Sequence, residues 1–187
     1  MSTIRAYSIE AITAKLFTHV EHEVLQAFPA DGGRLLQEGV SRFGTPVMKA
    51  IAAKADAEGE PHTMHAYIPS RTTAEPDPEK DVTMYAQMAR LFAAAAKAVV
   101  DVHGDAGRDA VREGVRTFGE SRGAGIAARA AEKGLPNTME HYLDNYDMER
   151  SALFEVETTY HQQDREIEQL FTVCPFGQQW ADDETGE

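Results

Sequence analysis

The chain has 187 residues, of which 42% are hydrophobic and 26% charged, and its net charge is −13. This length and composition predict one domain over 1–187 with its own hydrophobic core, which needs neither disulfides nor a metal to fold. The negative charge argues against binding to nucleic acid or to an anionic membrane, because both attract basic patches, and no stretch approaches the roughly 18 apolar residues of a membrane span.

The first part of the chain predicts three helices and a short fourth one. Apolar residues recur every four positions at Ile12, Leu16, Val20 and Val24, as on one face of a helix. Further helices are expected over about 31–43 and 46–58, with Gly44 and Gly59 as C-terminal caps. Thr63 is a candidate N-cap for a short helix that carries Tyr67.

After a proline-containing linker over 69–81, the same pattern returns at a shift of 75 residues. Residues 113–142 repeat much of 38–67, including Glu-Gly-Val, Phe-Gly, Ile-Ala-Ala and Gly-x-Pro-x-Thr-Met. Helices are therefore expected over about 106–118 and 121–133, ending near Gly119 and Gly134, with a short helix that carries Tyr142. The sequence predicts two tandem units, about 12–68 and 87–143, which pack as one core.

The periodicity changes near the end of the chain. Apolar and polar residues alternate around Val156 and Tyr160, and again around Ile167 and Val173, which predicts a β-hairpin within a β segment of about 152–176. The predicted fold class is therefore mainly α (α+β), with tandem multi-helix units followed by a C-terminal β-hairpin. Pro175 favours an extended Cys174 and ends the second strand there.

Cys174 is the only cysteine, so it cannot form an internal disulfide, and a reducing cytoplasm is the expected location. A thiol at a strand end is a candidate nucleophile, and the alternative is a small buried hydrophobic residue. Two histidine pairs, His19 with His22 and His62 with His65, have helical spacing that suits a metal. The alternative for both pairs is ordinary surface histidines.

Two arginines of the second unit have no counterpart in the first. On a helix over 121–133, Arg122 and Arg129 share one face with Ile126, which would suit a carboxylate-bearing ligand. The alternative is a pair of surface arginines that bond Glu120 or Glu132.

Acidic groups and a histidine near the second short helix are candidates for proton transfer. Glu140 and His141, followed by Asp144 and Asp147, could supply an acid and a base, or form a solvated polar turn. Glu113 lies in the repeated Glu-Gly-Val element, which favours a packing or capping role. Tyr142 is shared with the first unit and is expected to pack.

The run Phe118-Gly119-Glu120-Ser121-Arg122-Gly123, the following Ile-Ala-x-Arg-Ala and Gly-x-Pro-x-Thr, and the later Cys-Pro-Phe with Trp180 resemble the L-2-amino-thiazoline-4-carboxylic acid hydrolase family. The resemblance covers about 85–180. It implies a cofactor-independent hydrolase that opens a cyclic amidine or amide at a C–N bond. On this view Cys174 attacks, or a carboxylate activates water with no covalent step. His141 or Glu140 moves the proton, and Glu113 is a further catalytic candidate. Arg122 and Arg129 hold the substrate carboxylate, with Tyr142 beside them.

Two other functions stay open from the residues alone. One is a non-catalytic helical module that binds a small molecule or a partner in the groove between the units. The other is a metal-dependent amidohydrolase that uses His62, His65 and nearby carboxylates. The expected partner is a small-molecule substrate rather than nucleic acid or membrane, and a homo-oligomer is compatible with the sequence.

Overall fold

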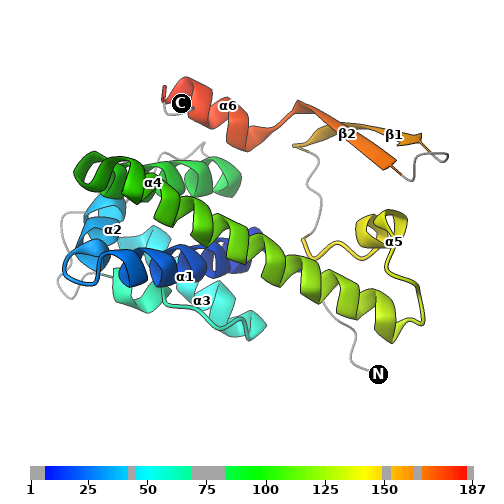
Figure 1. Cartoon of the computed structure of the whole chain (residues 1–187), viewed down its shortest axis with the longest axis horizontal. Helices are drawn as coiled ribbons and strands as arrows, with labels where there is room; N and C mark the ends of the chain where they lie inside the picture. The colour runs from blue at the N-terminus through cyan, green and yellow to red at the C-terminus, as the bar shows by residue number, and fades with distance from the viewer. Residues whose placement is uncertain (1–6, 42–44, 69–82, 149–152, 162–165, 185–187) are drawn as a thin grey trace.

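The computed structural model describes residues 7–41, 45–68, 83–148, 153–161 and 166–184. These residues form a helical body with a β-hairpin and a last helix attached to it (Figure 1). The expected linker over 69–81 lies outside the described residues. Among the described residues, no helix combines the length and the apolar character that crossing a bilayer requires.

The first half of the chain forms α1 (Ile9–Ala27), α2 (Gly32–Ser41), α3 (Thr45–Glu58) and the short 3-10 helix η1 (Met64–Tyr67). Ser8 caps α1, because its hydroxyl accepts a hydrogen bond from the Ala11 N–H at 3.2 Å. Gly59 follows α3 with a φ of 72°, as expected for a C-terminal glycine cap. Thr63 occupies the N-cap position of η1 as predicted, but its side chain makes no capping hydrogen bond to the helix.

The second half is dominated by α4 (Met84–Glu132), which turns sharply at Gly104. This residue has φ 56° and ψ −132°, a conformation that only glycine adopts without strain. The turn divides α4 into a first arm, 84–103, and a second arm, 105–132. The second arm passes so close to α1 that a Cβ on Gly114 would lie 2.5 Å from the Cα of Val20. Helix α5 (Met139–Asp144) follows, capped by Thr138 as predicted.

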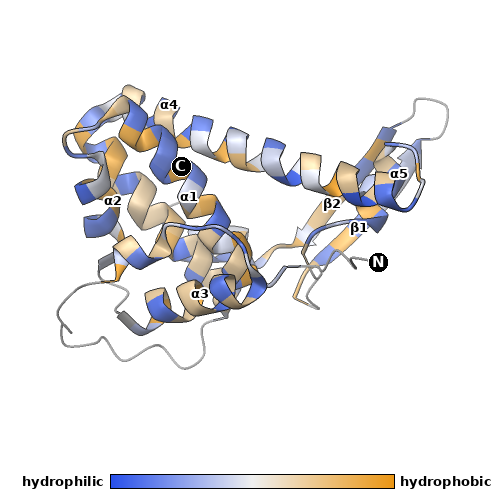
Figure 2. Cartoon of the chain, turned by 90° about the horizontal axis from the view of Figure 1, so that it is seen from below, coloured by the Kyte–Doolittle hydropathy of each residue, from blue (hydrophilic) through white to orange (hydrophobic). Residues whose placement is uncertain are grey.

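The hydrophobic core lies between α1, α2, α3 and the nearer parts of both α4 arms. Its fully buried side chains come from both halves of the chain, for example Val24, Leu36, Ile51, Leu91 and Val99. Beyond this core the second arm extends toward α5, and its turns alternate there between hydrophilic and hydrophobic residues (Figure 2). The second arm therefore carries polar side chains past the core, where α5 and the segment after it meet them.

The predicted hairpin is present as β1 (Glu155–His161) paired antiparallel with β2 (Glu166–Val173). The β segment does not reach 176, because Pro175 begins α6 (Pro175–Asp182). Proline suits the first helical position, where an N–H has no intrahelical acceptor. Phe176 of α6 packs against Tyr85 of α4 and Phe154, with ring centroids 5.5 Å and 5.8 Å apart, and this aromatic cluster attaches the C-terminal elements to the first arm.

The expected helix break at Gly119 is wrong, because residues 105–132 form one continuous arm of α4. The equivalent break in the first half precedes Pro46, the second residue of α3. A proline inside a helix removes an N–H and clashes with the preceding turn, but position 121 of the second half is a serine, so the helix continues. The two halves thus differ in architecture, and the tandem repeat remains a prediction from the sequence.

Candidate functional site

A buried ion pair between Arg122 and Asp147 joins the second arm of α4 to the segment after α5. The Arg122 Nε donates to the two Asp147 carboxylate oxygens at 2.9 Å and 3.1 Å, and Nη2 contacts the same carboxylate. The two side chains are 16% and 4% exposed. The guanidinium also lies between the rings of Phe118 and Tyr146, 5.4 Å and 5.0 Å from their centroids. Burial acts against the charge of Arg122, but its hydrogen bonds to Asp147 raise its pKa above the usual value.

Arg129 lies two helical turns further along the same face and has no such partner. Its Nε donates to the backbone oxygen of Asn145 at 2.9 Å. The residue is only 7% exposed, and its Nη2 has no hydrogen-bond partner among the described residues. No carboxylate of the described residues forms an ion pair with it either. Arg129 is therefore a buried cation with a free donor, an arrangement that favours an anionic ligand.

A second buried ion pair lies beside Tyr7, whose hydroxyl the charge of Arg129 also influences. Glu60, 9% exposed, pairs with Lys15 of α1 at 3.3 Å. Burial, and then the charge and hydrogen bonding of Glu60, raise the pKa of the Tyr7 hydroxyl, while Arg129 acts to lower it. Tyr7 also joins the segment after α5, since its backbone N–H donates to the Asp147 oxygen at 2.7 Å.

These contacts define the Arg129 site: Arg129, Asn145, Asp147, Tyr7 and Glu60. Its residues come from the start of the chain, the turn after α3, the far end of α4 and the segment after α5. Asp147 is neutralised by Arg122 and Glu60 by Lys15, so the charge of Arg129 is the one left uncompensated among these groups. A carboxylate would complete the charge balance of the Arg129 site.

The α5 candidates lie beside this site. Asn145 Nδ2 donates to the His141 backbone oxygen at 2.7 Å, so the segment that contacts Arg129 is hydrogen-bonded to α5. The ring of His141 has Nδ1 at 2.8 Å from the Pro136 carbonyl oxygen, a geometry that puts the proton on Nδ1 and leaves Nε2 as an acceptor. Glu140 is exposed. Tyr142 is half-buried, and burial followed by the neighbouring Tyr146 raises its pKa.

Two further candidates lie elsewhere. Glu113 pairs with Arg116 on the surface, and its hydrogen bonds to that guanidinium lower its pKa. It is sixteen residues from Arg129 on one straight arm, about 24 Å at 1.5 Å per residue. Cys174 is half-buried between β2 and α6, and its side chain does not cap α6. In Figure 1 the start of α6 and the connection of α4 to α5 lie in separate parts of the molecule.

The two histidine pairs have different surroundings. His19 Nδ1 lies 3.2 Å from the Thr117 hydroxyl, whereas His22 is exposed, so this pair does not converge. His62 and His65 do converge, because both hydrogen-bond the carboxylate of Asp56 at 3.0 Å. Asp56, which the sequence analysis did not single out, thus completes a cluster of three potential metal ligands on the outer side of α3 and η1.

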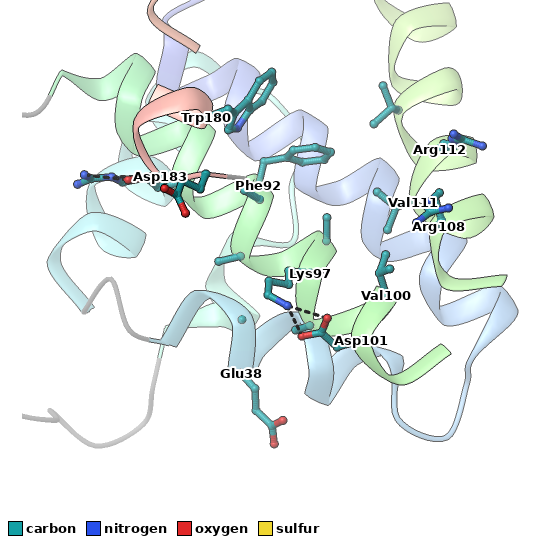
Figure 3. A pocket seen from close by; sticks show the side chains of 18 residues that line it. Glu38, Phe92, Lys97, Val100, Asp101, Arg108, Val111, Arg112, Trp180 and Asp183 are labelled. Carbon is teal, nitrogen blue, oxygen red and sulfur yellow. Dashed lines mark hydrogen bonds and ion pairs between the residues drawn. The ribbon is translucent and has the colours of Figure 1, made fainter. Parts of the chain in front are cut away.

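A long groove also runs between the two arms of α4 and below α6. Its volume is about 1600 Å³, and Figure 3 shows Phe92 and Trp180 on one side with Val111, Arg108 and Arg112 on the other. Small-ligand pockets are usually about 300–1,000 Å³, so this groove is larger than a single heterocycle needs.

Sequence reasoning found the two arginines but missed the groups that surround Arg129. Tyr7, Lys15 and Asn145 give no local signal in the sequence. Glu60 does give one, because the equivalent position of the second unit is Leu135. A charged residue in place of an apolar one, between a helix-ending glycine and a proline, could have marked Glu60 as a site residue.

Comparisons with known proteins bear on this site. A search of curated proteins and a search of solved structures each found no match. The family model for L-2-amino-thiazoline-4-carboxylic acid hydrolase matches residues 84–187, which include α4, α5, the hairpin and α6. Arg122, Arg129, His141 and Cys174 all lie within the match. Because the match spans more than half of the chain, this protein belongs to the L-2-amino-thiazoline-4-carboxylic acid hydrolase family.

Proposed function

We propose that this protein is a hydrolase that opens a small carboxylate-bearing heterocycle at a C–N bond of its cyclic amidine or amide. The first substrate to test is 2-amino-thiazoline-4-carboxylate, after which the family is named. The observation that carries the proposal is the buried, uncompensated guanidinium of Arg129, which lies within the matched residues. A hydrolase for a neutral ring would have no need of such a cation.

In this proposal Arg129 binds the substrate carboxylate through its free Nη2. Arg122 has a different role, because Asp147 already accepts hydrogen bonds from its Nε and Nη2 donors. It anchors the segment after α5 so that the Asn145 oxygen meets Arg129 Nε and fixes the plane of that guanidinium. A fixed guanidinium fork orients the ring as well as attracting it.

We assign the proton transfers to His141 and the attack to water. His141 Nε2, free to accept because Nδ1 faces the Pro136 oxygen, takes a proton from water as the water oxygen bonds to the amidine carbon. The ring C–N bond then breaks, and His141 returns that proton to the leaving nitrogen. The second water proton stays on the product, so atoms and charge balance without an external reactant.

Direct attack by Cys174 is the competing mechanism. It would form a covalent adduct at the same carbon, which water would later hydrolyse. The separation of α6 from α5 in Figure 1 favours water over the thiol of the same chain. A Cys174→Ser variant that keeps the wild-type rate supports the water mechanism, and one that loses turnover while keeping its circular dichroism supports the thiol.

The test of the proposed function uses two rings that differ only in the carboxylate. The protein is incubated with 2-amino-thiazoline-4-carboxylate or 2-amino-thiazoline, and the ring-opened product is measured by mass spectrometry. We expect kcat/KM to favour the carboxylate ring by about 100-fold, from a charge-assisted hydrogen bond of about 3 kcal/mol. In Arg129→Met this preference should vanish. Equal rates on both rings, or no product from either, would refute the proposal.

The groove between the arms of α4 supports a second candidate function, a non-catalytic binding module. Its size exceeds that of one heterocycle, and its apolar floor is bordered by Lys97, Asp101 and Arg108. This function predicts saturable binding of a larger ligand without any product. Product formation that is unaffected by Arg108→Glu, an exposed position in the groove, would favour the hydrolase.

A further inference from the structure

The cluster of Asp56, His62 and His65 lies in the part of the chain outside the family match and plays no role in the proposed reaction. His62 Nε2 lies 3.0 Å from Asp56 Oδ1, and His65 Nε2 lies 3.0 Å from Asp56 Oδ2. The two imidazole rings are 5.1 Å apart, and one ligand atom from each residue lies within 4.8 Å of the others.

The chain holds this cluster in place from two sides. Asp56 belongs to the last turns of α3, while His62 and His65 follow the turn at Gly59 and Pro61. The His62 side chain is only 2% exposed, whereas those of His65 and Asp56 are 62% and 56% exposed. The cluster therefore has one buried nitrogen at its base and an open outer side, where water or a further ligand can complete a coordination shell.

We propose that Asp56, His62 and His65 form a site for a divalent transition metal ion such as Zn²⁺ or Co²⁺. Two imidazole nitrogens and one carboxylate oxygen are ligands that these ions accept. In a tetrahedral zinc site with bonds of 2.0–2.1 Å, neighbouring ligand atoms lie about 3.3 Å apart. The distance of 3.0 Å from His62 Nε2 to Asp56 Oδ1 is close to this value, and His65 Nε2 lies 3.0 Å from the other oxygen of the same carboxylate. Small shifts of the two exposed side chains, Asp56 and His65, would bring the three ligand atoms around one ion.

Metal binding would exchange existing hydrogen bonds for coordination bonds. The Met64 N–H now donates to His62 Nδ1 at 3.2 Å, which places the His62 proton on Nε2. With a metal on Nε2 that proton moves to Nδ1, and the long bond from Met64 is lost. Two imidazole–carboxylate hydrogen bonds and the long bond from Met64 are thus exchanged for three coordination bonds, and the first residue of η1 is the part of the backbone that shifts.

The same metal would close a loop that carries a residue of the Arg129 site. Glu60 lies between the ligands at 56 and 62 and faces the other way, toward Lys15. An ion that bridges Asp56 to the two histidines would hold the turn at residues 59–61 and so the position of Glu60. This inference does not depend on the reaction, because metal binding is measured without substrate.

The experiment titrates the metal-free full-length protein with ZnCl₂ by calorimetry and with CoCl₂ by visible absorption. We expect one ion per chain and a higher Tm in the presence of zinc. Asp56→Asn and His65→Gln, both at exposed positions, should each weaken binding at least about tenfold. His22→Gln removes an exposed histidine of the other pair and should leave the affinity unchanged. Wild-type affinity in both Asp56→Asn and His65→Gln would overturn the proposal.

Cobalt also distinguishes this site from the thiol. A Co²⁺ ion bound by nitrogen and oxygen alone lacks the thiolate charge-transfer band that a sulfur ligand produces. We expect no such band, and the same spectrum in Cys174→Ala. A strong thiolate band that disappears in Cys174→Ala would place the metal at the cysteine and refute the site.

Discussion

Arg122 and Arg129 lie two turns apart on one helix face, yet the structure predicts different effects on stability when each is replaced by methionine. Arg122→Met removes the partner of Asp147, whose side chain is 4% exposed. An unpaired buried carboxylate costs about 3–5 kcal/mol. We therefore expect Arg122→Met to lower the free energy of unfolding by that amount and to loosen the segment that joins α5 to Tyr7.

Arg129→Met should leave the stability nearly unchanged. The variant loses the hydrogen bond from Nε to the Asn145 oxygen, which contributes about 1.5–3 kcal/mol for a charged donor. It also removes the buried, unpartnered Nη2, whose desolvation costs about 1–3 kcal/mol. These effects have opposite signs, so the net change should lie within about 1 kcal/mol of zero, while binding of the carboxylate substrate is lost.

Urea unfolding followed by circular dichroism measures both variants under the same conditions. Arg129→Lys is the matched control, because it keeps the positive charge but removes the planar fork. It should retain part of the preference for the carboxylate ring. If Arg129→Met were as unstable as Arg122→Met, Arg129 would be a structural residue, and the proposal that the Arg129 site binds a carboxylate would be refuted.

Three further predictions follow from single contacts. Gly119→Ala should stabilise α4 by about 0.5–1 kcal/mol, because its Cβ would meet no atom within 4 Å. The control Gly114→Ala should destabilise the protein through the contact with Val20, and the midpoints of urea unfolding measure both changes. Burial, and next the charge of Lys15, lower the pKa of His19 in the folded protein. The unfolded chain therefore binds this proton more readily, and the protein loses stability as the pH falls below 6.5. His19→Gln should show a smaller drop in Tm between neutral and mildly acidic pH than wild type. Tyr67→Phe should keep or raise the Tm, because the buried Tyr67 hydroxyl has no partner among the described residues, and a clear loss of stability would contradict this.

Periodicity was sufficient to predict the first helix and the hairpin. The face of Ile12, Leu16, Val20 and Val24 is buried in α1, and the alternation around Val156 and Ile167 forms β1 and β2. These elements follow from local pattern, in which each residue faces either the core or water. The start of α6 at Pro175 could also have been inferred, because proline is common at the first position of a helix as well as after a strand.

The candidate site was less predictable, because its geometry depends on contacts distant in sequence. Arg122 and Arg129 were identifiable as residues without counterparts in the first unit. The fold of α5 and the following segment decides that Asp147 pairs with Arg122 and not with Arg129. In the same way, Asp56 meets His62 and His65 only after the turn at Gly59 reverses the chain.

The comparison between the two units explains why Arg129 lacks a counter-ion. Its equivalent in the first unit is Lys54, which forms a pair one helical turn away with Glu58 at 3.5 Å. The equivalent of Glu58 in the second unit is Lys133, so the acid that would neutralise Arg129 along the helix has become a base. Lys133 in turn donates to the Asn145 side chain. Within the second unit, this single change of charge therefore replaces an ion pair along the helix with two cations that face the same segment, and a ligand carboxylate is the partner that this arrangement still accepts.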